Sequence, residues 1–224
     1  MDPSSLDIRP FVEPTFGENA YVVSTTTHDG RRPGWVIDPG LGRQPDLLLA
    51  YASSHQIAIE KILLTHGHGD HVAGVDTVRG AWSKAELLIG GPDAAMLTDP
   101  QLNLSAPFGF DVVVETPVAR HLEPEMELLL GDLKWSVLDT SGHSPGGRSL
   151  YCPAAGVVFT GDALFSGSIG RTDFPGSDAG RLIANIHRHL LTLPGETVVY
   201  SGHGPSTTIR NEQKFNPFLS DAYS

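Results

Sequence analysis

The sequence predicts an α/β fold built from layered sheets and helices. Short apolar runs bounded by Gly, Pro, Asp or Asn recur in both halves of the chain, a pattern typical of buried strands. Segments with apolar residues at helical spacing lie between these runs. Strand-rich halves with interleaved helices pack as layers. We expect one domain over residues 1–224, because a chain of this length can bury a substantial core.

In the first half, apolar and β-branched runs predict strands at residues 7–12, 20–25, 35–37, 61–64 and 87–89. The third strand is expected to end at Asp38, which precedes Pro39-Gly40. Residues 45–53, which include three consecutive leucines, predict a helix, and a short helix is expected after His71.

In the second half, strands are expected at residues 127–130, 134–138, 148–152, 157–160 and 198–200. The clearest helix covers 179–191, where Leu182, Ile186 and Leu190 follow helical spacing. Ser177 or Asp178 is suited to cap its start. A final helix is expected near 209–215.

Four potential metal ligands follow the apolar run 62–64 within six residues: His66, His68, Asp70 and His71. Imidazole and carboxylate are the usual ligands of zinc and related first-row metals. The glycines between these residues permit the tight backbone that such a cluster needs. The two histidines at i and i+2 can share one metal, while the Asp-His pair can reach a second.

Three further candidates each follow an apolar run, in a loop rich in Gly or Pro: His143, Asp162 and His203. Each alone is typical of a turn residue. Ligands on strand-end loops at one edge of a sheet can nevertheless converge across a long sequence. Together with the first cluster, they predict a metal site with seven ligands.

This order of motifs, His-x-His-x-Asp-His followed by Gly-His, Gly-Asp and Gly-His, resembles the metallo-β-lactamase superfamily. Residues 161–176, 202–205 and 216–219 resemble the compact glyoxalase II-like hydrolases of bacteria. The resemblance runs from about residue 19 to residue 219. It implies a four-layer αββα sandwich with metals at one edge between two sheets.

The resemblance also implies how the ligands divide between two divalent metal ions, with zinc expected and iron or manganese as alternatives. It places His66, His68 and His143 on one metal, places Asp70, His71 and His203 on the other, and makes Asp162 the bridge. Two metals about 3.5–4 Å apart generate hydroxide from a bridging water near neutral pH. That hydroxide would attack the carbonyl carbon of a small acyl thioester, with Asp70 and Asp162 as catalytic carboxylates.

An alternative function is a mononuclear iron oxygenase resembling persulfide dioxygenases, with His66, His143 and Asp162 as a facial set. The chain after His203 has no room for the helical domain with which glyoxalase II binds glutathione, so we expect glutathione recognition to differ. Arg171 can bind an anionic end of the substrate or pair with Asp173.

Several other segments carry expectations. Thr65, Thr140 and Ser141 can orient ligand imidazoles or only form local turns. Residues 96–119 form either a wall of the substrate cleft or a solvated excursion. We expect Cys152 to be a buried apolar residue rather than a nucleophile. No metal role is expected for the remaining histidines: His28, His55, His121, His187 and His189.

The formal net charge of −11 and the scattered distribution of 15 basic residues disfavour a nucleic-acid partner. The sequence shows no signal peptide and no apolar run near the roughly 20 residues of a membrane span. We therefore expect a cytoplasmic protein with a small-molecule substrate and no membrane partner.

Overall fold

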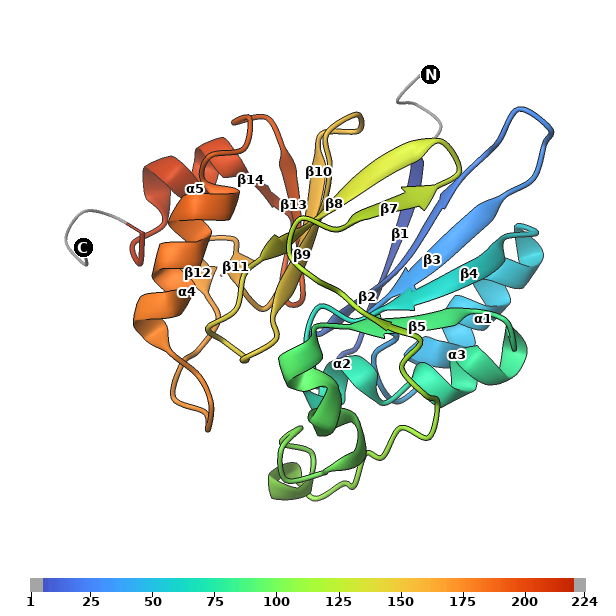
Figure 1. The fold of residues 1–224 in the computed structure, drawn as a ribbon, viewed down its shortest axis with the longest axis horizontal. Coiled ribbons are helices and arrows are strands. Elements are labelled where there is room, and N and C mark those ends of the chain that lie inside the picture. Colours follow the sequence, from blue (N-terminus) through green and yellow to red (C-terminus); the bar gives the residue numbers. More distant parts are fainter. Residues whose placement is uncertain (1–5, 220–224) are drawn as a thin grey trace.

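Two six-stranded sheets face each other at the centre of the molecule, and helices cover the outer face of each (Figure 1). The computed structural model describes residues 6–219, so residues 1–5 and 220–224 of the predicted domain lie outside the described residues. The first sheet has the order β1 (Leu6–Val12), β2 (Asn19–Thr25), β3 (Pro33–Ile37), β4 (Ala58–Leu63), β5 (Glu86–Ile89) and β6 (Arg120–His121). The second has the order β14 (Thr207–Thr208), β13 (Val198–Ser201), β10 (Val157–Gly161), β9 (Arg148–Cys152), β8 (Leu133–Asp139) and β7 (Glu127–Leu130).

The chain connections decide which strands run parallel. Strands β3 and β4 are joined by α1 (Gln44–Ser54), and α2 (Gly69–Val72) and α3 (Val75–Ala81) separate β4 from β5. Both pairs are parallel, as crossover connections require. In the second sheet, β10 and β13 are parallel. The chain between them includes the hairpin β11 (Leu164–Phe165) and β12 (Ser168–Ile169), then α4 (Ala179–Asn185) and the π-helical turn η4 (Ile186–Leu190).

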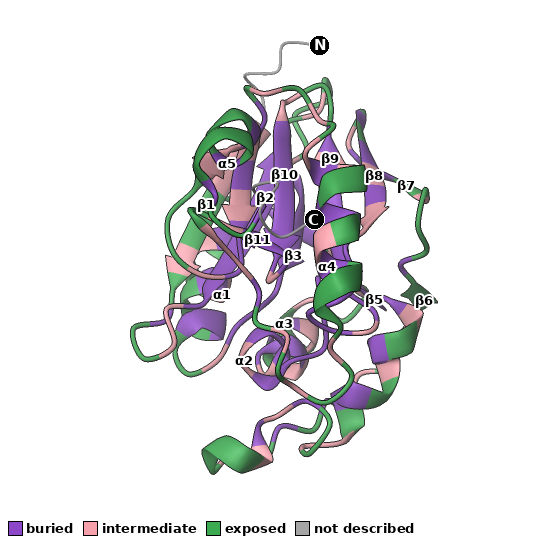
Figure 2. Cartoon of the chain, turned by 90° about the vertical axis from the view of Figure 1, so that its left-hand side faces the viewer, coloured by how far each residue is buried: buried purple, intermediate pink, exposed green. Residues whose placement is uncertain are grey.

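Alternating side chains of the strands fill separate cores. On β2, Tyr21 and Val23 point into the core between the sheets, whereas Ala20 and Val22 join the core under α1 and α3. A third core lies under α4, η4 and the last helix, α5 (Ile209–Phe215). Both faces of the central strands are therefore buried, as the purple strands in Figure 2 show.

The predicted four-layer αββα fold is confirmed, with strand ends shifted by up to three residues. The fourth strand begins at Ala58 rather than residue 61, because β4 continues its pairing with β3. The predicted helix at 179–191 divides into α4 and η4, and Asp178 caps it by accepting from the Arg181 N–H. Strands β6, β11, β12 and β14 were not predicted, and each has only two residues.

Residues 96–119, for which the sequence predicts no regular element, contain the end of the 3₁₀ helix η2 (Gly91–Thr98), the short turn η3 (Ala106–Phe108) and connecting loops. Cys152 is buried between the two sheets among apolar side chains, as expected. Within residues 6–219, no helix has both the length and the apolar character needed to cross a membrane.

Candidate metal centre

The structure brings all seven predicted ligand side chains together from four loops that follow strands. The first histidine group is His66, His68 and His143, whose nearest ring nitrogens all lie within 4.8 Å of one another. The second group is Asp70, His71 and His203, which meets the same distance limit. Members of each group come from widely separated parts of the sequence, so the fold assembles the site.

Asp162 lies between the two groups and contacts both. Its Oδ2 atom is 3.5 Å from His143 Nε2 and 3.5 Å from His203 Nε2. Its Oδ1 atom is 3.5 Å from His71 Nε2. The carboxylate that follows β10 therefore lies between the two groups and within 3.5 Å of ring nitrogens of both.

The close approach of these side chains depends on a missing side chain at Gly202. A Cβ atom at this position would overlap the Asp162 carboxylate and would lie 2.8 Å from His71 Cε1. The glycine before His203 thus leaves room for the ligands of both neighbouring loops.

Backbone carbonyls fix the orientation of two ligand rings. The Nδ1 atom of His143 lies 2.8 Å from the carbonyl oxygen of Arg171, and that of His203 lies 3.0 Å from the carbonyl oxygen of Phe16. A carbonyl only accepts, so each Nδ1 must carry the proton. Each Nε2 then presents its lone pair to the centre, as a metal ligand must.

A buried carboxylate that was not predicted, Asp38, serves both groups. One of its oxygens accepts from the Thr65 hydroxyl at 2.6 Å and lies 3.1 Å from His71 Nδ1, while the other accepts from the Thr65 N–H at 2.8 Å. The Thr65 oxygen in turn lies 3.0 Å from His66 Nδ1. Asp38 has a φ of 47°, a left-handed conformation that Asp tolerates. The available signal was an acid directly after a buried strand, the same pattern that identified Asp162.

A second unpredicted carboxylate, Asp93, joins the two loops of the first histidine group. It accepts from Gly67 N–H at 3.1 Å, from Ser144 Oγ at 2.6 Å and from Gly146 N–H at 2.5 Å. Asp93 is fully buried, and burial raises its pKa. No local sequence signal marks it, because all three donors are distant in the chain.

Glu18 is also buried next to the second group. Its Oε2 atom accepts from Gln44 Nε2 at 2.6 Å, while Oε1 lies 3.8 Å from His71 Nδ1 and has no hydrogen-bond partner. Burial raises the pKa of Glu18 well above its usual value.

The two groups differ in their electrostatics. Burial lowers the pKa of His66 well below its usual value and lowers that of His68 to about 3. In the second group, burial opposes the charged forms, but attraction between the imidazoles and carboxylates outweighs it. The pKa of Asp70 is lowered, and the pKa of His71 is raised well above its usual value.

The donor set fits divalent cations. His66 Nε2 and Asp162 Oδ1 are buried and have no hydrogen-bond partner, although such buried polar atoms are nearly always paired. Ring nitrogens also face one another, at 2.9 Å between His68 Nδ1 and His143 Nε2 and at 3.4 Å between His71 and His203. Cations placed between these atoms would satisfy them all.

Three hydroxyl residues near the ligand loops were candidates for orienting ligand imidazoles, and they have different partners in the structure. Thr65 contacts a ligand ring, whereas the Thr140 hydroxyl pairs with Ser149 and the Ser141 hydroxyl pairs with Asn185. Of the three, Thr65 alone is placed to orient an imidazole.

Arg171 pairs with Asp173 through two contacts of 2.6 and 2.7 Å, and its guanidinium lies 4.3 Å from the centre of the Phe174 ring. It also lines the cavity described below, so its role in substrate binding stays a prediction.

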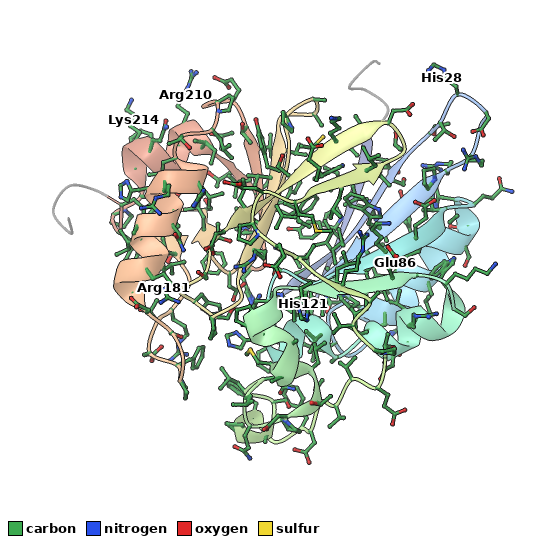
Figure 3. The ribbon with its side chains drawn as sticks, in the orientation of Figure 1. His28, Glu86, His121, Arg181, Arg210 and Lys214 are labelled. Atoms are coloured by element: carbon green, nitrogen blue, oxygen red, sulfur yellow. The ribbon has the colours of Figure 1, made fainter. Side chains whose placement is uncertain are left out.

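The remaining histidines do not join either group among the described residues. Figure 3 shows His28 at the tip of the β2–β3 hairpin, remote from the ligand loops. His187 and His189 lie on η4, where the first is exposed and the second is partly exposed.

A cavity of about 330 Å³ opens directly onto both groups. His68, Asp70, His143, Asp162 and His203 form its floor. Its walls include Asn103, Leu104, Ser105, Phe108 and Phe110 from the stretch at 96–119. That part of the chain is therefore a wall of the cavity and not a solvated excursion.

Comparisons with known proteins agree with this geometry. The sequence model of the metallo-beta-lactamase superfamily matches residues 14–203. A probable metallo-hydrolase of Bacillus subtilis, YqgX, is 42% identical over 185 residues, which are 83% of this chain and 86% of the relative. Hydroxyacylglutathione hydrolase GloC of Haemophilus influenzae is 32% identical over 193 residues, which are 86% of this chain and 90% of that protein.

Solved structures show the same similarity. BLEG-1 B3 metallo-beta-lactamase is 38% identical with a TM-score of 0.87, and the match covers 96% of this chain and 100% of that one. TTHA1623 in a di-iron-bound form is 38% identical with a TM-score of 0.81, and the match covers 94% of this chain and 100% of that one.

Proposed function

This chain belongs to the metallo-beta-lactamase superfamily and is a metal-dependent hydrolase, and we propose that it cleaves small acyl thioesters at a centre of two metal ions. The observation that carries the proposal is the position of Asp162, whose two oxygens lie 3.5 Å from ring nitrogens of both ligand groups. Two divalent cations bound there would supply a strong oxygen nucleophile from water and would polarise the substrate carbonyl.

The residues of the chain would hold and orient these groups. The first histidine group would bind one cation, and the second group would bind the other. Asp162 would fix the separation between them and offset part of their charge. Asp38 and the two backbone carbonyls would keep the ring N–H groups turned away from the centre, so that each Nε2 remains available.

A thioester is favoured over an ester or amide by what the cavity lacks. Among the described residues that line it, none is Lys, Tyr or Cys, and the Ser105 hydroxyl is engaged with Asn103. The histidines and aspartates of the lining would all be occupied in holding the cations. A thiol has a pKa of about 8.5, so a thiolate leaves without a general acid. The relationship to the Haemophilus hydroxyacylglutathione hydrolase supports the same choice.

The metal is proposed to be zinc, with iron as the alternative suggested by the di-iron form of TTHA1623. The mononuclear oxygenase alternative needs only three ligands, so it gives no role to His68 or to the second group, Asp70, His71 and His203. The convergence of those three residues beside Asp162 supports the dinuclear proposal.

Steady-state hydrolysis of thioesters by protein reconstituted with zinc, manganese or iron tests the proposal. We expect thiol release that depends on the metal and stops after chelation. A preference for lactones or β-lactams over every thioester would contradict it. Oxygen consumption with a persulfide would instead support the oxygenase.

A further inference from the structure

The cavity above the ligand groups has walls made largely of phenylalanine. Five of the nine phenylalanines of the chain line it, together with two aliphatic residues. These apolar lining residues are Phe16, Leu104, Phe108, Phe110, Phe165, Ile169 and Phe174. Such a concentration of apolar side chains around a polar floor is typical of a ligand-binding pocket.

One wall of the cavity is held in place by contacts within the protein itself. Phe16 contacts Phe108 and Phe110 edge to face, with ring centres 5.8 and 6.2 Å apart. The buried Asn103 side chain holds this segment by donating to the carbonyls of Met96 and Val112, at 2.9 Å each. The Asn103 carbonyl accepts from Gly69 N–H, which ties the wall to the ligand loop.

Two further phenylalanines of the lining lie close to the ligand groups. The Phe174 ring lies 5.6 Å from that of His68, and the Phe165 ring lies 6.1 Å from that of His203. A carbonyl carbon placed near Asp162 would therefore lie close to apolar surface.

The walls of the cavity offer no free cationic side chain to an anionic group. Arg171, the one Lys or Arg among the described lining residues, is already paired with Asp173. Figure 3 shows Arg210 and Lys214 by α5, at the end of the molecule away from the green segment that includes residues 96–119.

We propose that this cavity is an acyl pocket, and that the substrate is a thioester of an apolar acyl group, aliphatic or aromatic. The inference rests on the proposed thioester hydrolysis. The acyl group fills the phenylalanine-lined space, and the polar thiol portion extends into solvent past Phe108, whose side chain is 57% exposed. A cavity of about 330 Å³ holds such a group but not a large thiol carrier as well.

Two substrate series separate the acyl side from the thiol side. In the first, acyl groups from acetyl to octanoyl, and benzoyl, are joined to N-acetylcysteamine. In the second, the acyl group remains acetyl while an alkyl thiol is lengthened. We expect kcat/KM to rise about two- to four-fold for each added acyl methylene until the pocket is full, and to change little along the thiol series.

Variants of the wall provide the matched comparison. Phe108→Ala and Phe110→Ala should flatten the acyl series, mainly through a higher KM for octanoyl and benzoyl thioesters. Phe215→Ala, which removes a 64% exposed ring on α5, should leave the series unchanged. Calorimetry with the amide analogue of the octanoyl thioester should show binding with a negative heat-capacity change that Phe108→Ala reduces.

The outcomes distinguish the pocket from the activity. Thioester hydrolysis with a flat or falling acyl series, or with a rise along the thiol series instead, overturns the acyl pocket and leaves the proposed function standing. Failure to hydrolyse any thioester with both metals bound overturns both.

Discussion

Replacing Asp93 by asparagine should weaken the first histidine group, although Asp93 itself is not a ligand. The carboxylate accepts from Gly146 N–H on one oxygen and from Gly67 N–H and Ser144 Oγ on the other. An asparagine amide retains one oxygen, so in either orientation its NH₂ faces one of the two backbone N–H groups. One buried donor is left unpaired, which costs about 1–3 kcal/mol of folding free energy.

The same change should also lower metal affinity. Gly67 lies between His66 and His68, and Gly146 follows His143, so the lost hydrogen bond frees a ligand loop. Changes to groups that orient ligands typically cost 10–100-fold in metal affinity. We therefore expect one of the two zinc ions to bind about 10–100-fold more weakly in Asp93→Asn, and the other to bind as in the wild type.

The assays are denaturant unfolding of chelated protein and zinc competition against a chromophoric chelator. Asp76→Asn is a matched control, because Asp76 also accepts from two backbone N–H groups, those of Glu115 and Thr116, and from the Thr116 hydroxyl. These donors belong to neither ligand group and do not line the cavity, and they are exposed or part-buried. Asp76→Asn should therefore lose less stability and should keep its zinc affinity. Equal zinc affinity in the two variants would refute the reasoning.

Three further predictions concern the centre itself. Asp162→Asn should reduce kcat by about 100-fold or more in metal-reconstituted protein, because a bridging charge is lost; near-wild-type turnover would remove it from the centre. Gly202→Ala should lower the metal content measured by elemental analysis, because the added methyl group overlaps the Asp162 carboxylate. The circular dichroism spectrum should stay native. Gly80→Ala is the control, because its methyl group enters open space. Because metals displace protons, zinc affinity at the second group, where the pKa values of His71 and His203 are raised, should fall as pH drops through neutrality. Zinc affinity at the first group, where the pKa values of His66 and His68 are lowered, should be the same at both pH values. Calorimetric titrations at pH 6 and pH 8 measure this, and an equal loss of affinity at both sites at pH 6 would contradict it.

The strands were predictable because burial on both faces leaves continuous apolar runs ended by glycine, proline or aspartate. The ligands were visible for the same reason, since each follows such a run. Two-residue strands such as β11 and β12 are too short to show an alternating or apolar sequence pattern. Their pairing depends on the surrounding tertiary structure.

The carboxylates that support the ligands were missed for a different reason. The donors to Asp93 lie 26, 51 and 53 residues away in the chain, so the fold alone reveals their meeting. Asp38 did carry a local signal at the end of β3, but the Asp38-Pro39-Gly40 turn explained it without a site. The sequence left Arg171 with two alternatives, binding an anionic end of the substrate or pairing with Asp173. The structure shows the contact with Asp173.

The most direct test of the account is anomalous diffraction from crystals of the metal-reconstituted protein. We predict two metal peaks about 3.5–4 Å apart, one within the first histidine group and one within the second, with Asp162 between them. A single peak in protein that retains full thioester hydrolysis would contradict the dinuclear centre.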